Sequence, residues 1–255
     1  MSEAENNKIS VLILTLNEEH QMKSLLADLD FADEIIVVDS LSTDNTEAIC
    51  NSFPKVNFVQ KPFENYPNQR NYAISLAKND WILFLDADER LTVELKSEIL
   101  QTIRKNTTQI AFQFRRTFMF KNKVLHFSGS QNDKIFRLFD KRFAHYAAEK
   151  LVHEKLITNG KTGILKNKLI HYSYQNYVAY KSKIIRYGAL KALEKYQQKE
   201  KPNLFLQNLH PTYNFCYNYL IRLGILDGKK GIIICFLNAY SIHIRYQKLN
   251  QLNRK

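Results

Sequence analysis

Three carboxylates follow a run of apolar residues. Residues 81–85 have the composition of a buried strand, and Asp86, Asp88 and Glu89 come directly after it. The carboxyl end of a parallel strand is where open α/β sheets bind ligands. Side chains alternate along a strand, so Asp86 and Asp88 are expected to point the same way. Carboxylate oxygens are typical ligands of Mg²⁺ or Mn²⁺, and these ions in turn bind diphosphates. The alternative for so short a DXD motif is a solvated acidic turn.

The segments around these carboxylates alternate between strand-like and helix-like patterns of apolar residues. Apolar runs predict strands at residues 9–14, 34–38, 56–59 and 81–85. Helices are predicted between these strands and after the fourth one. One covers residues 68–77, and another is capped by Thr92 and runs through Ile103. This alternation predicts an α/β fold, a mostly parallel sheet with helices on both faces.

Polar residues also follow the first two strands. Thr15, Asn17 and Glu18 come after the first strand, and Asp39 closes the second. The carboxyl ends of parallel strands meet at one edge of a sheet. Convergence of three such strand ends is less expected by chance than any single motif, so the sequence predicts a polar site at this edge.

The pattern loosens after residue 103. Strand character returns at residues 110–114, 134–139 and 165–174, with a loop-rich stretch at 118–133. From Val178 onward the spacing is helical. We therefore predict two parts, an α/β domain at residues 1–177 and a basic helical extension at residues 178–255.

Composition limits the class of protein. The 255 residues are 45% apolar, which is enough for one large α/β domain or a domain with an extension. The three cysteines are far apart and form no CxxC pair, so neither a zinc site nor a disulfide framework is expected. Residues 1–7 are polar and lack the pattern of a secretory signal, so we expect a cytoplasmic protein.

The net charge of +12 is concentrated in the C-terminal part. Residues 181–255 hold 14 Lys and Arg against three Asp and Glu, whereas the first 180 residues hold 23 against 22. Such asymmetry predicts contact with an anionic partner. The apolar segment 231–244 is flanked by basic residues, and it fits either an interfacial helix at a membrane or a buried helix.

Glycine is absent from the N-terminal half, since all seven glycines lie at or after Gly129. The predicted sheet edge therefore has neither a GxGxxG turn nor a P-loop. A nucleotide bound there would need another means of holding its phosphates, which favours a metal carried by carboxylates.

Three segments together resemble the family 2 glycosyltransferases of the GT-A fold. They are Val11 to Glu18, Val37 to Asp44, and Leu83 to Asp88, matching T-x-N-E, V-V-D-x-x-S-T-D and D-A-D. The closer resemblance is to the branch of lipopolysaccharide inner-core β-1,4-glucosyltransferases. It is carried by residues 68–73, 151–154, 169–173 and 222–228, and so covers most of the chain.

This resemblance implies roles for the strand-end residues. Asp39 would accept hydrogen bonds from the base or ribose of the donor, in a pocket that Thr15, Asn17 and Glu18 line. A turn residue before a helix is the alternative for Asp39. Asp86 would contact ribose or metal, and the relatives' second aspartate is here Ser40, which leaves the donor nucleotide open.

The remaining roles concern the metal, the diphosphate and the acceptor hydroxyl. Asp88 and His171 would bind the divalent cation, Mg²⁺ or Mn²⁺, and Gln69 and Arg70 would lie beside the diphosphate. Glu154 would be the general base of an inverting transfer. The alternative for His171 is a structural role. The alternative for Arg70 is a solvent-exposed position on a helix, and for Glu154 it is a charged position in a loop. Residues 115–120 and the basic tail are candidates for acceptor recognition.

The sequence as a whole predicts an inverting, metal-dependent hexosyltransferase. The donor is expected to be a nucleotide sugar, with UDP-glucose first, and the acceptor the heptose region of an anionic, lipid-linked oligosaccharide at the inner face of the cytoplasmic membrane. The alternative is a related transferase acting on a capsule, glycoprotein or polyprenyl-linked acceptor. A nucleic-acid-binding module is not expected, because it leaves the acidic edge unexplained. A scaffold without activity is disfavoured by the intact Asp86, Asp88, Glu154 and His171.

Overall fold

The computed structural model describes residues 7–105, 107–120, 123–131, 133–147, 155–174 and 177–254. The chain divides into two compact units. One comprises Met1–Arg116 and Lys134–His171, and the other comprises Thr117–Asp133 and Tyr172–Lys255. The grouping of residues 117–133 with the C-terminal helices is a feature that the sequence did not predict.

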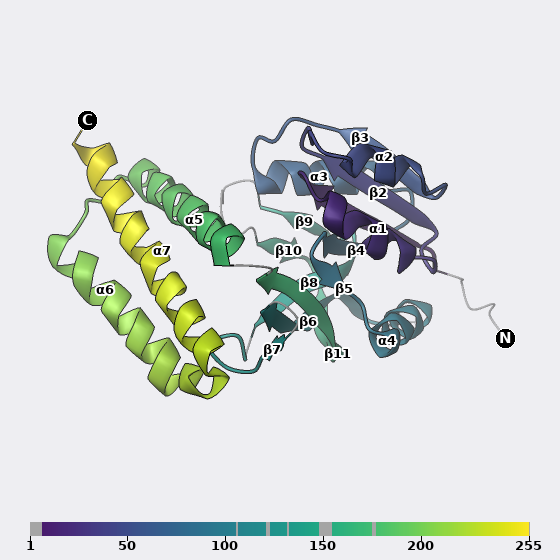
Figure 1. The fold of residues 1–255 in the computed structure, drawn as a ribbon. Helices are drawn as coiled ribbons and strands as arrows, with labels where there is room; N and C mark the ends of the chain where they lie inside the picture. The colour runs from purple at the N-terminus through teal and green to yellow at the C-terminus, as the bar shows by residue number, and fades with distance from the viewer. Residues whose placement is uncertain are drawn as a thin grey trace. The chain divides into compact units, whose positions relative to one another are not determined.

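The elements alternate between strand and helix in the first hundred residues (Figure 1). In chain order they are β1 (Ile9–Thr15), α1 (Glu19–Ala27), β2 (Glu34–Asp39), α2 (Thr46–Asn51), β3 (Val56–Gln60), α3 (Tyr66–Leu76), β4 (Trp81–Asp86), β5 (Glu89–Arg90) and α4 (Val93–Arg104). The strands β6 (Gln109–Phe120), β7 (Lys123–Leu125), β8 (Lys134–Asp140), β9 (Ala144–Tyr146), β10 (Leu156–Thr158) and β11 (Lys161–Tyr174) follow. Thr92 caps α4 as predicted, since its side chain accepts a hydrogen bond from the Leu95 amide.

The main sheet has a parallel half and an antiparallel half. Its order is β3-β2-β1-β4-β8-β6-β11-β5, with β7 paired to β6. The strands β3, β2, β1 and β4 pair in parallel, as the strand–helix alternation predicts. The pairs β4–β8, β8–β6, β6–β7 and β11–β5 are antiparallel. The strand order switches at β1, with β2 on one side and β4 on the other, so a ligand site is expected at the carboxyl ends of β1 and β4.

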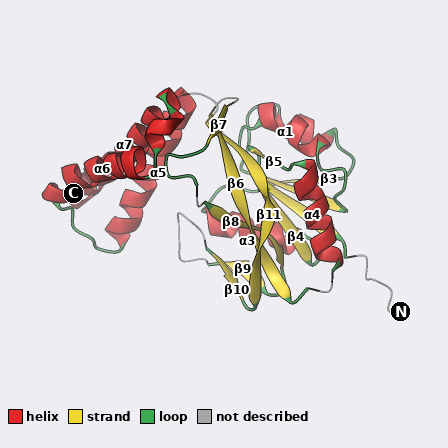
Figure 2. Cartoon of the chain, turned by 90° about the horizontal axis from the view of Figure 1, so that it is seen from below, coloured by secondary structure: helices red, strands yellow, loops and turns green. Residues whose placement is uncertain are grey.

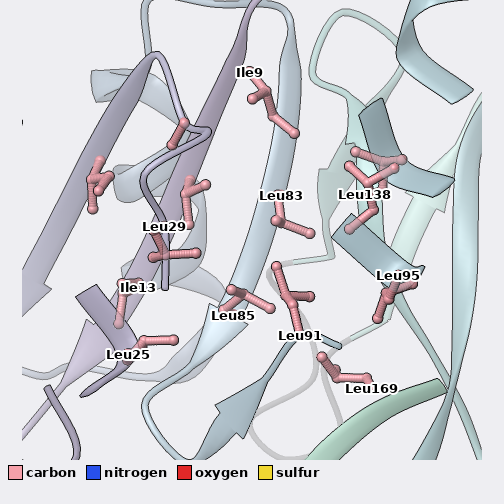
Figure 3. Packing of buried hydrophobic residues seen from close by; sticks show 14 of the residues in the cluster. Ile9, Ile13, Leu25, Leu29, Leu83, Leu85, Leu91, Leu95, Leu138 and Leu169 are labelled. Atoms are coloured by element: carbon pink, nitrogen blue, oxygen red, sulfur yellow. The ribbon is translucent and has the colours of Figure 1, made fainter. Parts of the chain in front are cut away.

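Alternation along the strands divides the core between the two faces of the sheet. On one face, odd-numbered residues of β1 and β4 such as Ile13 and Leu83 pack against α1, α2 and α4 (Figure 3). On the other face, even-numbered residues such as Leu12 and Phe84 pack against α3. The residue that ends β4, Asp86, has the parity of Phe84 and therefore lies on the α3 side.

The C-terminal unit is mostly helical (Figure 2). Its elements are α5 (Tyr177–Gln197), α6 (Leu204–Cys216), the π-helical turn η1 (Tyr217–Ile221), the 3₁₀ turn η2 (Gly224–Asp227) and α7 (Lys229–Asn253). Helix α7 contacts both α5 and α6. Within the described ranges, no helix has both the length and the apolar content needed to cross a membrane.

The apolar segment 231–244 lies in α7 and contributes to the core of this unit. Ile234 and Leu237 are buried in a cluster with Phe118, Tyr180 and Ile184. The two predicted alternatives were an interfacial helix at a membrane and a buried helix. Packing within the protein accounts for the buried face of the segment.

Candidate active site

The ends of β1 and β2 are joined by a buried hydrogen-bond cluster. Thr15 and Asp39 are register partners, and the Thr15 hydroxyl donates to Asp39 Oδ1 over 2.9 Å. The Ser42 amide donates to Asp39 Oδ2 over 2.7 Å, and the Ser42 hydroxyl donates to Oδ1. Asp39 is fully buried. In this structure its carboxylate organises the β2–α2 loop, and its predicted role in binding the donor nucleotide stays a prediction.

Asn17 and Glu18 lie in the loop after β1, beside the β2–α2 loop. Asn17 has a left-handed backbone (φ 55°), which asparagine tolerates better than most residues. Its amide donates to Ser42 Oγ over 2.7 Å, and its side-chain oxygen accepts from the Thr43 amide over 2.8 Å. The Glu18 amide donates to Thr46 Oγ1 over 2.9 Å. The structure thus brings Thr15, Asn17 and Glu18 together beside Asp39, as the sequence predicted.

Helix α3 directs Gln69 and Arg70 toward the sheet. The helix begins after Asn65, whose side chain accepts from the Asn68 amide. Gln69 is fully buried, and its Nε2 donates to Ser40 Oγ over 3.2 Å and to the Lys61 carbonyl over 3.0 Å. Gln69 therefore connects α3 to the residue that follows Asp39.

Arg70 lies against aromatic rings and a carboxylate. Its guanidinium carbon is 4.4 Å from the centroid of the Phe84 ring and 5.2 Å from that of Tyr146. Its Nη2 is 3.2 Å from Asp86 Oδ1. Arg70 is 6% exposed, so it is not the solvated helix arginine that the sequence left open. Such a rigid, buried cation can hold an anionic group in a fixed place.

Asp86 is held by two guanidinium groups. Arg70 contacts one carboxylate oxygen and Arg137 Nη2 the other. Burial raises the pKa of Asp86, but the nearby cations, Arg137 first and then Arg70, outweigh this effect and hold the pKa well below its usual range. Asp86 is therefore a carboxylate at neutral pH. Its side chain is 34% exposed, so it can still meet a ligand.

Glu89 and Arg137 form a fully buried ion pair behind Asp86. Arg137 Nη2 donates to Glu89 Oε1 over 2.7 Å, and both side chains have no exposed surface. Glu89 Oε2 accepts from the Asp86 amide over 3.1 Å. The pair thus fixes both the backbone and the carboxylate of Asp86 at the end of β4.

Asp88 and His171 lie together at the turn that follows β4. His171 Nε2 is 3.2 Å from Asp88 Oδ1, and Arg116 Nη1 is 3.3 Å from His171 Nδ1. An arginine can only donate, so Nδ1 accepts and Nε2 carries the proton facing Asp88. His171 is the register partner of Glu89 on the β11–β5 ladder, which explains how a residue 83 positions later in the chain reaches Asp88.

The direction of Asp88 comes from a turn and not from a strand. Strand β4 ends at Asp86, and Ala87 and Asp88 form the turn to β5. Alternation along a strand therefore does not set the direction of Asp88. Asp86 engages arginines, whereas Asp88 engages His171.

A divalent cation could replace the proton between Asp88 and His171, which requires Arg116 to move away from Nδ1 so that this nitrogen carries the proton. Adjacent ligands of an octahedral Mg²⁺ or Mn²⁺ with bonds of about 2.1 Å lie roughly 3 Å apart, close to the observed 3.2 Å. No group of three or more His, Cys, Asp and Glu side chains that could hold a metal occurs within the described ranges. The protein would thus supply two ligands, and phosphate oxygens and water would complete the shell, as is usual for magnesium.

The predicted base, Glu154, lies outside the described residues, as does the rest of the segment 148–154.

Sequence analysis missed the roles of three charged residues. Arg137 lies in a predicted strand whose other residues gave no hint of a buried charge. Glu89 is the third acid of the group Asp86, Asp88 and Glu89, and its full burial distinguishes it from the other two. Arg116 was a candidate for acceptor recognition, but it lies 3.6 Å from Glu89 and beside His171. An arginine in an otherwise apolar strand was the one available signal.

Comparisons with known proteins show the family to which the chain belongs. The family described as glycosyl transferase family 2 matches residues 10–186. An uncharacterised glycosyltransferase of Rickettsia bellii is 30% identical, over 99% of this chain and 90% of that protein. The lipopolysaccharide core biosynthesis glycosyltransferase LpsC of Rhizobium meliloti is 24% identical, over 93% of each chain.

The fold has a counterpart among solved structures. The mannosyltransferase PcManGT of Pyrobaculum calidifontis, in complex with GDP-mannose and Mn²⁺, superposes with a TM-score of 0.55 and covers 96% of this chain and 88% of its own. At 14% identity this likeness concerns the fold alone, the GT-A arrangement of a mixed sheet flanked by helices. The match over residues 10–186 and the 30% identical relative show that this protein belongs to glycosyltransferase family 2 and is a glycosyltransferase.

Proposed function

We propose that this glycosyltransferase uses a divalent cation, Mg²⁺ or Mn²⁺, which Asp88 and His171 hold. The observation that carries the proposal is the 3.2 Å separation of these two side chains at the end of β4, beside Asp86. When bound, the cation would neutralise charge on the departing nucleoside diphosphate. Mn²⁺ in the complex of the structurally similar mannosyltransferase supports this choice of ion.

The chain's own residues would bind and orient the donor. Arg70 would add fixed positive charge near the diphosphate, and Asp86, held as a carboxylate, would accept from ribose hydroxyls. The loops that Asp39 organises would shape the pocket for the base, with Thr15, Asn17, Glu18 and Gln69. UDP is the first candidate nucleotide, from the resemblance of the motifs, and GDP or ADP would follow.

We propose that residues 1–177 form the catalytic domain and that the transfer inverts the anomeric carbon. In such a transfer, a carboxylate opposite the leaving group takes the proton of the acceptor hydroxyl as it attacks C1. Glu154, in Val152-His153-Glu154-Lys155, is the candidate by resemblance.

Replacing Glu154 by glutamine is expected to lower transfer by about 10²- to 10⁴-fold, the usual contribution of a general base. Affinity for the donor nucleotide should stay within about twofold, because the amide keeps the shape of the acid. Turnover with a radiolabelled donor and calorimetric titration with UDP measure the two quantities. Glu94→Gln, at an exposed residue of α4, is the matched control and should keep wild-type turnover. Loss of nucleotide binding in Glu154→Gln would instead give Glu154 a structural role.

The acceptor is proposed to be the heptose region of the lipopolysaccharide inner core, and the sugar to be glucose. The printed name of LpsC, which concerns lipopolysaccharide core biosynthesis, supports the acceptor class. Such an acceptor is lipid-linked and anionic, which agrees with the basic C-terminal part and with action at the cytoplasmic face of the inner membrane. A capsule, glycoprotein or polyprenyl-linked acceptor is the alternative, and profiling with each acceptor class separates them.

Titration of the purified protein with UDP, with and without Mn²⁺, tests the donor site. We expect binding in the presence of Mn²⁺ that is at least tenfold tighter than in EDTA, because the ion joins the diphosphate to the protein. Equal UDP affinity in both conditions would contradict a metal-dependent site. If GDP or ADP binds and UDP does not, the proposed metal-dependent site stands, and the donor carries that other nucleotide.

A further inference from the structure

An exposed apolar stripe runs along α6 and η1. Five residues repeat at intervals of four, which places them on neighbouring turns of one helix face. They are Phe205, Leu209, Tyr213, Tyr217 and Ile221. Phe205 is 74% exposed and Ile221 is 69% exposed, and the rings of Tyr213 and Tyr217 stack with centroids 5.7 Å apart. A soluble monomer rarely exposes large apolar side chains in such a continuous row.

The stripe continues into the turn before α7. Four more large apolar side chains are exposed in η1 and in the segment between η1 and α7, namely Leu220, Leu223, Ile225 and Leu226. We call these four residues and the five of the stripe the α6 ridge. The opposite faces of this region are used for packing, since α6, η1 and η2 all contact α7.

The charges around the α6 ridge are mostly positive. Between residues 200 and 255 the sequence holds eight Lys and Arg and two carboxylate side chains, Glu200 and Asp227. Asp227 is buried and accepts from the amides of His126 and Phe127 and from the Ser128 hydroxyl, and Glu200 pairs with Lys195. Lys201 and Lys229, which flank the ridge in sequence, are exposed. The ridge therefore combines apolar side chains with a net positive charge.

This combination fits an anionic bilayer better than it fits another copy of the chain. Two copies meeting through the ridge would bring like charges together, which is unfavourable across an interface. A membrane surface offers acyl chains to Phe, Leu and Ile, its interfacial region to tyrosine, and anionic headgroups to lysine. Basic residues near such a surface are attracted to its anionic headgroups.

We propose that the α6 ridge is a membrane-docking surface, which lies in the interface of an anionic bilayer with Lys201 and Lys229 at the headgroups. The inference assigns this contact to α6, η1 and η2, whereas the apolar segment 231–244 of α7 supplies core packing. It depends on neither the donor nor the acceptor of the glycosyltransferase.

Sedimentation with sucrose-loaded vesicles tests the docking surface. The probes are vesicles of phosphatidylglycerol and phosphatidylcholine, and vesicles of phosphatidylcholine alone. We expect the full-length protein to bind the anionic vesicles at least tenfold more tightly than the neutral ones at low salt. Phe205→Glu/Ile221→Glu should lower binding to anionic vesicles at least tenfold, because it removes two exposed apolar groups and adds negative charge.

Two controls separate docking from general effects. Val93→Glu places the same charge on an exposed apolar residue of α4 and should bind as the wild type does. Lys201→Glu/Lys229→Glu should weaken binding to anionic vesicles and reduce the salt dependence of binding. Lys168→Glu, at an exposed residue of β11, should have a smaller effect on both quantities. UDP affinity should stay unchanged in every variant, so that failure of docking is distinguishable from failure of the donor site.

Three outcomes would overturn the proposal. They are equal vesicle binding by the wild type and Phe205→Glu/Ile221→Glu, no preference for anionic vesicles, and a ridge-dependent dimer in sedimentation equilibrium with no vesicle binding. The last outcome would assign the ridge to a second copy of the chain.

Discussion

Asp88→Ala is expected to lower sugar transfer by at least about 10³-fold, while the protein stays folded. Asp88 would supply the one carboxylate ligand among the two proposed metal ligands, and it lies 3.2 Å from the other, His171. Stabilising a departing diphosphate is electrostatic catalysis, for which loss of a single stabilising group costs about 10²- to 10³-fold and loss of an ion costs more. The tightening of UDP binding by Mn²⁺ should disappear in the same variant.

Turnover and calorimetry on the same preparations check this expectation. Asp30→Ala removes an exposed aspartate and should keep wild-type activity. The free energy of unfolding of Asp88→Ala should fall by only about 1 kcal/mol, because the variant removes a single, partly exposed contact with His171. Wild-type turnover in Asp88→Ala would remove the metal role from this residue, and His171→Gln would then test whether the pair matters at all.

Arg137→Met is expected to destabilise the protein by about 3 kcal/mol. The variant leaves the fully buried Glu89 carboxylate without its closest cation and removes one of the two guanidinium groups on Asp86. Breaking a buried ion pair by removing one partner costs about 3–5 kcal/mol. Arg137 Nε and Nη1 have no hydrogen-bond partner in the described part of the chain, and their removal offsets some of this cost. The lower end of the range is therefore expected.

Chemical denaturation measures this change, with a double-mutant cycle to assign it. Adding Glu89→Gln to Arg137→Met should recover at least about 1 kcal/mol, since the amide carries no charge that needs a partner. Arg104→Met, on an exposed residue of α4, should cost less than about 1 kcal/mol. A loss for Arg137→Met no larger than that for Arg104→Met would show that Glu89 and Asp86 do not depend on the buried arginine.

Much of the α/β unit could be predicted because its signals are local. The strands β1, β2, β3 and β4 begin at the predicted residues. In β1, β2 and β4 a run of apolar side chains buried on both faces differs clearly from the polar turns on either side. The strand ends also carried the polar residues that the fold brings to one edge. Thr15 and Asp39 form a register pair, and Asp86 ends β4.

The antiparallel half of the sheet and the charged network could not be predicted in the same way. Arg137, Arg116 and His171 come from β8, β6 and β11, and the hydrogen bonds among Arg137, Glu89, Arg116 and His171 join residues about 50 positions apart. No local pattern encodes such a pairing, because register and strand order result from packing of the whole sheet.

The sequence alone determined the α/β class, the family resemblance and the polar edge, because periodicity and strand-end chemistry are properties of short segments. Only the tertiary structure decided which partner each charge has. It separated Asp86, between Arg70 and Arg137, from Asp88, beside His171, and it buried Asp227 beneath the α6 ridge, whose neighbours are mostly positive. The physical reason is that the state and role of a charge depend on burial and on nearby charges in space, which sequence distance does not fix.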